Sequence, residues 1–155
     1  MLKFYSGLST AVNSKQAAAE CIELALGDGA ADCNLLVIHS TVGHNFAQAL
    51  AAAKAACPEA QIVGCSGAGV IGREGVSENM RAMAMMAVKG TELSVAAADG
   101  LKSENSMSVA QGVAGELKAA SDNISIIYCL TSGLDVRGDE VIAGIESVFG
   151  PDIPI

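Results

Sequence analysis

Two copies of one pattern of strands and helices make up this sequence, and the second copy stops before the pattern is complete. The offset between matching segments is 92 residues in one case (105 − 13) and 93 in two others (116 − 23 and 151 − 58). A nearly constant offset over three separated anchors predicts an internal duplication within a single domain, with repeat one at about residues 1–90 and repeat two at about residues 91–155. The matching segments are Asn13-Ser14 with Asn105-Ser106, Glu23-Leu24 with Glu116-Leu117, and Pro58–Ile62 with Pro151–Ile155.

In the first copy, short apolar runs alternate with helical periodicity. Asn13 offers a helix N-cap, and Gln16 follows at the position that a capping box requires. The run Leu35–Ile38 is continuously apolar, which is typical of a strand covered on both faces. The expected strands are Leu2–Leu8, Leu35–Ile38, Gln61–Cys65 and Met80–Val88, and the expected helices run from Asn13 to about Gly27 and from His44 to Cys57, the latter with Phe46, Leu50, Ala53 and Cys57 on one apolar stripe.

The second copy repeats strand, helix, strand and helix and then ends. We expect strands at Leu93–Ala98 and Ile124–Leu130, and helices at about Asn105–Ala120 and Val141–Phe149. Gly90-Thr91 leaves only a short turn before Leu93, which favours antiparallel pairing of Met80–Val88 with Leu93–Ala98. The sequence therefore predicts an α/β fold: a layered mixed sheet with flanking helices, built from two β-α-β-α-β-β repeat units of which the second is incomplete.

The duplication places Ile155 at the position of Ile62, so the glycine-rich and Met-rich segments that follow Ile62 have no second counterpart. We expect the chain to be a fragment whose missing strands leave a sheet edge unpaired. The alternative is that the sheet closes with a partner chain, for example as a homodimer through that edge.

Composition excludes several classes of protein. The chain is 51% hydrophobic and 17% charged, which excludes disorder, and no apolar run is long enough to span a membrane. The start of the chain lacks the pattern of a signal peptide, and five cysteines without a C-x-x-C pair fit a reducing compartment, so we expect a cytoplasmic protein. A net charge of −8 and 3% aromatic residues argue against nucleic acid as a partner.

The segment Gly67–Gly72 satisfies the G-x-G-x-x-G pattern that binds dinucleotides after a strand. The polar residues 73–79 that follow do not open a helix, so the motif lacks the context that a nucleotide site requires. A loop that needs glycine for tight turns is the simpler interpretation. A loop that turns backbone N–H groups toward a small anionic ligand lies between the two.

Residues 64–68 nearly form a nucleophile elbow, with Ser66 placed after a strand. No helix follows, and the sequence shows no cation or helix N-terminus that would activate Cys65 as a thiolate. A hydrolase-like enzyme that depends on Ser66 or Cys65 therefore stays the alternative to a binding function.

Two further groups of polar residues follow expected strands. His39, His44 and Cys33 match no zinc spacing, so we expect no metal site. Ligands commonly bind where strands end in α/β sheets, so Ser40, Thr41 and His44 are ligand-contact candidates. In the second copy the equivalent loop contains Thr131, Ser132, Asp135 and Arg137. Arg137 has the geometry to hold a carboxylate with two hydrogen bonds, and the alternative is a surface Asp135–Arg137 pair.

The segment Gln61–Ile71 resembles the N-terminal FIST domain, a sensory module of bacterial signal-transduction proteins. The family carries an Ile/Val-Gly-Cys-small-small-Ala-Gly segment after an apolar strand and helix. Met80–Val88 is similar to the strand that follows that segment. The motif residues carried over are Gly64, Cys65, Ser66, Gly67 and Gly69.

The resemblance implies a non-enzymatic domain without a cofactor that binds small ligands, amino acids among them. It also implies a C-terminal companion domain or output module, which this chain does not contain. For an amino acid, Arg137 or the backbone amides of Gly64–Gly69 would bind the carboxylate, and Asp135 or Glu140 the ammonium. A pure interaction scaffold with no small ligand is the third possibility.

Overall fold

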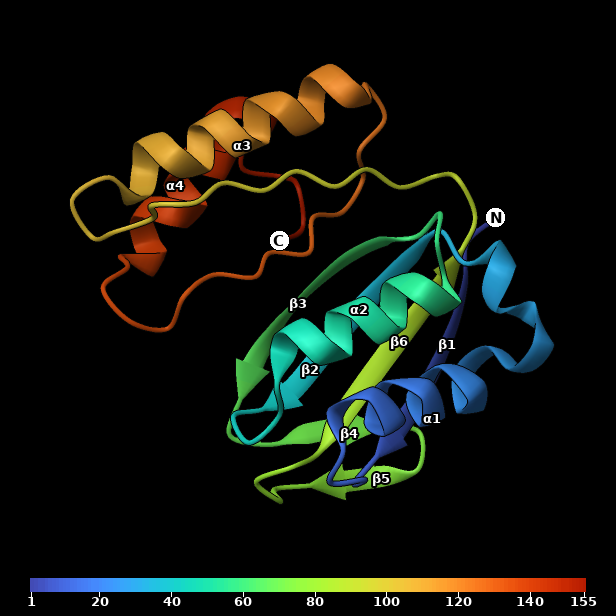
Figure 1. The fold of residues 1–155 in the computed structure, drawn as a ribbon. Helices are drawn as coiled ribbons and strands as arrows, with labels where there is room; N and C mark the ends of the chain where they lie inside the picture. Colours follow the sequence, from blue (N-terminus) through green and yellow to red (C-terminus); the bar gives the residue numbers. More distant parts are fainter. The chain divides into compact units, whose positions relative to one another are not determined.

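The computed structural model describes residues 1–30 and 32–155. The chain divides into two compact units, Met1–Glu92 and Leu93–Ile155, drawn from blue to yellow-green and from yellow to red in Figure 1. This division lies close to the expected boundary between the repeats, and the duplication itself stays a prediction.

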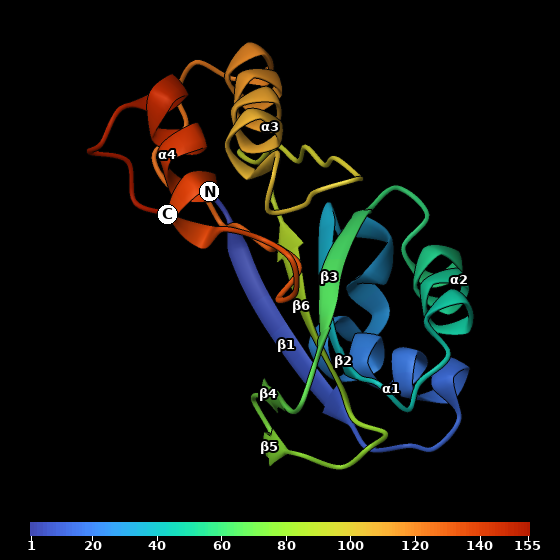
Figure 2. The same ribbon diagram turned by 90° about the vertical axis from the view of Figure 1, so that its left-hand side faces the viewer.

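A four-stranded mixed sheet forms the centre of the first unit. Its strand order is β1 (Lys3–Ser9), β6 (Met83–Lys89), β2 (Leu35–Thr41) and β3 (Gln61–Gly67), as Figure 1 shows. Figure 2 shows the same sheet from the side. β2 and β3 are parallel, and β6 is antiparallel to both β1 and β2. The mixed sheet is therefore confirmed. The expected pairing of the Met-rich strand with Leu93–Ala98 is wrong, because β1 and β2 take both edges of β6.

Two helices cover one face of this sheet, α1 (Ser14–Leu26) and α2 (Phe46–Ala56) (Figure 1). α1 begins as predicted, because the side chain of Asn13 accepts hydrogen bonds from the backbone N–H groups of Lys15 and Gln16. The Gln16 side chain donates to Glu20 rather than completing a capping box. α1 ends at Gly27, whose φ of 50° favours glycine, and a 3₁₀ helix over Gly27–Asp32 follows.

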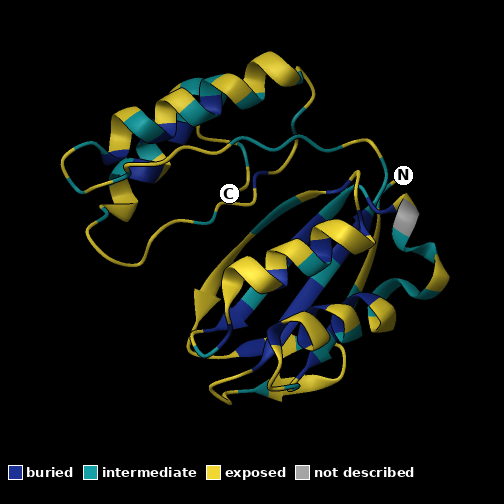
Figure 3. Cartoon of the chain, in the orientation of Figure 1, coloured by how far each residue is buried: buried dark blue, intermediate teal, exposed yellow. Residues whose placement is uncertain are grey.

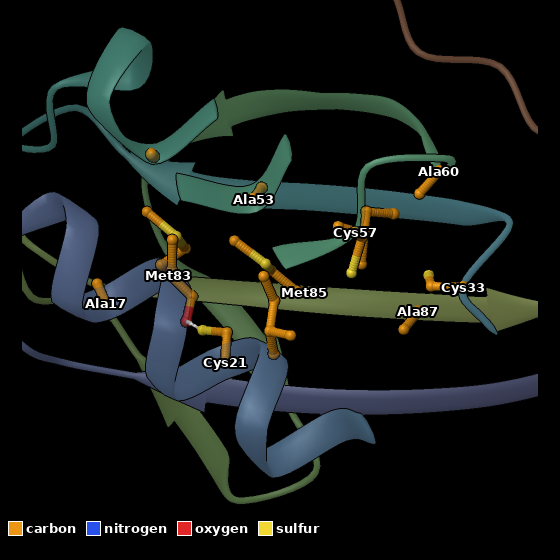
Figure 4. Packing of buried hydrophobic residues seen from close by; sticks show 13 residues of the cluster. Ala17, Cys21, Cys33, Ala53, Cys57, Ala60, Met83, Met85 and Ala87 are labelled. Atoms are coloured by element: carbon orange, nitrogen blue, oxygen red, sulfur yellow. Dashed lines mark hydrogen bonds between the residues drawn. The ribbon is translucent and has the colours of Figure 1, made fainter. Parts of the chain in front are cut away.

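The core between helices and sheet is built mostly from small residues and methionines (Figure 4). Burying one large side chain such as Leu36 or Met85 contributes about 1.5–3 kcal/mol. Alanines on both helices let them approach the sheet closely. The buried residues of the cluster are Ala17, Ala18, Cys21, Ile22, Cys33, Leu36, Ala49, Ala53, Cys57, Ala60, Met83, Met85 and Ala87.

The predicted apolar stripe on α2 is only half right. Ala53 and Cys57 are buried, whereas Phe46 and Leu50 are 49% and 50% exposed. Figure 3 shows exposed residues in yellow along the outer side of α2. Ala49 is buried in their place. Residues 49, 53 and 57 recur every four positions, so α2 turns its smallest side chains toward the sheet.

The glycine-rich stretch that was expected to be a loop forms a hairpin of β4 (Val70–Gly72) and β5 (Gly75–Ser77). Gly75 sits in the turn with a φ of 133°, which favours glycine. Val70 packs against Ala82, Ala84 and Leu8 on the sheet face that the helices leave uncovered. The hairpin thus covers one end of that face.

The second unit contains two helices, α3 (Ser106–Ala120) and α4 (Gly138–Phe149), both as predicted. They cross closely at Gly144, where a Cβ would lie 2.5 Å from the carbonyl oxygen of Met107. The core of the unit consists of Ala110, Ala114, Ile127, Val141 and Ile145.

Neither expected strand of the second unit, Leu93–Ala98 or Ile124–Leu130, is a strand. In the first unit β6 lies between β1 and β2 and provides the hydrogen bonds of both. Among the described residues, no strand pairs with either of these two segments. The N–H of Ile127 donates a hydrogen bond to the carbonyl of Pro154 at 2.9 Å.

The described residues thus form a mixed α/β fold of four helices, a four-stranded mixed sheet and a hairpin. Among them, no helix combines the length and apolar character that a membrane crossing needs.

Candidate functional site

The parallel pairing of β2 and β3 brings several of the predicted site residues together. His39 lies opposite Cys65, Ser40 opposite Ser66, and Thr41 opposite Gly67. These residues come from sequence positions about 26 apart, and the carboxyl ends of the two strands meet at one edge of the sheet. Two groups of candidates that the sequence analysis named separately therefore lie side by side within the first unit.

Gly64 is required for this close pairing. A Cβ at this position would lie 1.9 Å from the carbonyl oxygen of Ile38 on β2. Only glycine lets the two backbones approach so closely. The chain from Gly64 to Gly69 is exposed throughout, because β3 is an edge strand within the described part of the sheet.

Ser40 and Thr41 belong to β2 instead of to a loop after it, and both are buried. The Ser40 hydroxyl donates to the carbonyl of Thr41 at 3.1 Å. Thr41 Oγ1 donates to the carbonyl of Met80 at 2.7 Å and accepts from the N–H of Ala82 at 2.9 Å. These hydroxyls tie β2 to the segment that leads into β6, which is a structural role.

His44 lies before α2 and is 5% exposed. Its Nδ1 is 3.2 Å from Ser14 Oγ, which also accepts a hydrogen bond from the N–H of Asn45 at 2.9 Å. Ser14 therefore joins the start of α1 to the start of α2. Burial, and next the positive charge of Arg81, lower the pKa of His44. His44 Nε2 is a buried atom without a hydrogen-bond partner among the described residues.

Sequence reasoning missed the partner of Cys65. Its Sγ lies 3.3 Å from Nδ1 of His39, and the pair is exposed. Only the register of β2 against β3 reveals this contact, because the two residues are 26 positions apart. The arrangement places a nitrogen base beside an accessible thiol.

The second group of candidates lies before α4. Ser132 forms a local turn, with its hydroxyl donating to the carbonyl of Leu134 and accepting from the N–H of the same residue. The Thr131 hydroxyl donates to the carbonyl of Ser132. Asp135, with a φ of 53°, accepts from the Ser103 hydroxyl at 2.6 Å. These contacts shape the loop.

Arg137 precedes α4 and pairs with two carboxylates of its first turn. Its guanidinium lies 2.6 Å from Glu140 and 3.6 Å from Asp139. The backbone N–H of Arg137 donates to Ser106 Oγ on α3 at 3.1 Å, which fixes the loop to that helix. The Arg137 side chain is 56% exposed, so the guanidinium remains accessible from solvent.

No metal centre is found: in the part of the chain that the structure describes, no three His, Cys, Asp or Glu side chains are grouped to hold an ion.

In a comparison with protein families, residues 34–155 match the FIST N domain. The matched range includes the exposed segment Gly64–Gly69 and the loop that carries Arg137. The comparison with curated proteins gives no significant match. Because the family match covers well over half of the chain, and confirms the resemblance around Gly64, the protein belongs to the FIST N domain family, a family of sensory domains of signalling proteins.

Proposed function

We propose that this chain is the non-enzymatic, cytoplasmic ligand-binding domain of a bacterial signalling protein, and that its ligand is an amino acid. The observation that carries the ligand proposal is the Arg137–Glu140 pair, in which a guanidinium and a carboxylate lie 2.6 Å apart on an accessible surface. The five free cysteines fit a reducing compartment.

An amino acid carries both charges that this pair complements. Its carboxylate would take the two-pronged contact with Arg137, and its ammonium would lie against Glu140 or Asp135. Arg137 is 56% and Glu140 28% exposed, and an ion pair at the surface is worth about 0–1 kcal/mol, so a ligand displaces the internal contact at small cost. The exposed backbone amides of Gly64–Gly69 are the alternative carboxylate site.

The position of Arg137 also suggests how binding is transmitted. Its backbone N–H is bonded to Ser106 on α3, and its side chain contacts the first turn of α4. A ligand on Arg137 therefore acts on the joint between the two helices. It shifts the domain between two states only to the extent that it binds them with different affinity. A companion domain or output module would respond to that shift.

The test is thermal unfolding of the full chain with each of the twenty amino acids. A ligand at 100 times its Kd stabilises the native state by about 2.7 kcal/mol, which is a rise of several degrees in Tm. Arg137→Ala should abolish this rise, and Glu140→Gln should reduce it. The control Arg73→Ala changes an exposed arginine of the β4–β5 turn and should keep it.

Two results would overturn the proposal. If no amino acid raises Tm at millimolar concentration, the interaction scaffold becomes the better account. If Arg137→Ala binds as well as the parent, the ligand lies elsewhere. Of the enzymatic alternatives, only the thiol has gained a specific observation, the contact between Cys65 and His39.

A further inference from the structure

Cys65 differs from the other cysteines in its surroundings. Burial raises the pKa of Cys21 to about 12 and that of Cys57 to about 11, so both stay protonated thiols. Cys33 is also buried. Cys129 in the second unit is exposed like Cys65, but partial desolvation raises its pKa, and no histidine is recorded beside its thiol among the described residues. Cys65 is exposed and has Nδ1 of His39 at 3.3 Å.

The sheet separates Cys65 from the other thiols of its unit. Successive strand residues point to opposite faces, and Leu36, Ile38 and Ile62 belong to the core under the helices. His39 and Cys65 therefore lie on the face that the helices leave uncovered. Cys21, Cys33 and Cys57 all belong to the core on the helix side (Figure 4). Cys65 thus has no disulfide partner within its own unit, so a mixed disulfide formed there is not resolved by a second cysteine of that unit.

Both side chains of the pair stand on rigid elements. His39 and Cys65 are directly opposite in the parallel register of β2 and β3. Gly64 precedes Cys65 and holds the two backbones close, as described above. The proton acceptor is therefore fixed beside the thiol by the sheet rather than by a mobile loop.

We propose that Cys65 is a thiol-modification site that reacts with small disulfides, with His39 as the acceptor of its proton. The Sγ–H proton passes to Nδ1 of His39, and the thiolate attacks one sulfur of a disulfide R–S–S–R. The S–S bond breaks, a Cys65–S–S–R bond forms, and R–S⁻ leaves with the electron pair. The imidazolium then gives its proton to water, or to R–S⁻ where the leaving thiol is basic enough to take it. One thiol and one disulfide enter and one of each leaves, so no further oxidant is needed.

The modification adds a group at the exposed end of β3, next to Ser66 and Gly67. It changes the same exposed edge that carries the family motif. The inference does not depend on the amino acid ligand, because it rests on the first unit alone. It gives the domain a thiol-based input that is reversed by reduction.

The test uses dithiobis(nitrobenzoate), an aromatic disulfide whose thiolate product is coloured, on the native full chain near neutral pH. The parent should show one fast reacting thiol. Cys65→Ser should lose the fast phase, and the matched control Cys129→Ser should keep it. His39→Gln keeps a polar side chain but cannot take the proton, so the fast phase should slow by about fivefold, which corresponds to the loss of about 1 kcal/mol of stabilisation of the developing thiolate. Its Tm should equal that of the parent.

Peptide mapping of the unmutated chain after treatment with glutathione disulfide locates the adduct without any substitution. An adduct on Cys65 supports the site even where Cys65→Ser folds poorly. A fast phase that survives in folded Cys65→Ser, or an adduct mapped to another cysteine, overturns the proposal. If folded His39→Gln reacts at the parent rate, the role of His39 is refuted.

Discussion

Replacing Gly64 by alanine should break the pairing of β2 and β3 and with it the strand-end cluster. The new Cβ would lie 1.9 Å from the carbonyl oxygen of Ile38, whereas real Cβ contacts are not shorter than 3.0 Å. The two strands must therefore separate by about 1.1 Å at this point (3.0 − 1.9). A backbone hydrogen bond of ordinary length does not survive such a shift.

The cost can be estimated from two contributions. Overpacking at a close contact costs about 1–3 kcal/mol, and each lost ladder bond about 1 kcal/mol. Gly64→Ala should thus lower the free energy of unfolding of the first unit by about 3 kcal/mol. For a unit of about this size the Tm falls by more than about 10 °C. The same displacement moves Cys65 away from His39, so the fast thiol phase should also slow.

Urea unfolding followed by circular dichroism measures this effect. Gly112→Ala is the matched control, because it places a Cβ in open space within α3. It should stabilise the chain by about 0.5–1 kcal/mol, as alanine is the better helix former. If Gly64→Ala unfolds within about 0.5 kcal/mol of the parent, the close approach of β3 to β2 is wrong and the geometry of the site fails with it.

Two further predictions concern the helices. Gly144→Ala places a Cβ 2.5 Å from the carbonyl oxygen of Met107, so it should force α3 and α4 apart. The free energy of unfolding should fall by about 1–3 kcal/mol, measured as a lower urea midpoint. An unchanged midpoint would refute the close crossing of the two helices. Because the pKa of His44 is lowered in the native state, the unfolded chain binds a proton at this histidine more readily than the native state does. The stability that the neutral His44 contributes is therefore present above about pH 6.5 and is lost as the pH falls below that value. Tm measured between pH 7.5 and 5 should therefore decline more steeply for the parent than for His44→Gln, and equal declines would contradict the buried, neutral state of His44.

Much of the first unit follows from local sequence signals. Asn13 predicts the start of α1, and the apolar run Leu35–Ile38 predicts β2, because caps and hydrophobic patterns act over a few residues. The partner of the Met-rich strand could not be read in this way. A short turn at Gly90 favoured Leu93–Ala98 as the partner, but β6 is placed between β1 and β2 by contacts far apart in the sequence.

The same limit explains the other differences. Phe46 and Leu50 fit an apolar helical stripe in the sequence. In the structure α2 packs close to the sheet, so the small side chains of Ala49 and Ala53 are buried instead. The segments expected as strands in the second unit have the right composition, but no strand among the described residues pairs with them, and strand hydrogen bonds require such a partner.

The candidate site was found in part. Strand-end positions picked out residues 40–41 and 64–67 separately as candidates, and the parallel pairing of β2 and β3 places them side by side. Burial could not be predicted, and it assigns Thr41 and His44 to internal hydrogen bonds. The pairing of His39 with Cys65 depends on a register that the sequence alone does not specify.

The most direct test of amino acid sensing is a titration of the ¹⁵N-labelled chain, followed by amide chemical shifts, with the amino acid that raises Tm most. We predict saturable shifts at Arg137, Asp139 and Glu140 and at Ser106 on α3, and their loss in Arg137→Ala. Saturable shifts confined to Gly64–Gly69 would move the carboxylate site to the backbone amides of the first unit. The absence of saturable shifts at both places would contradict ligand sensing by this domain.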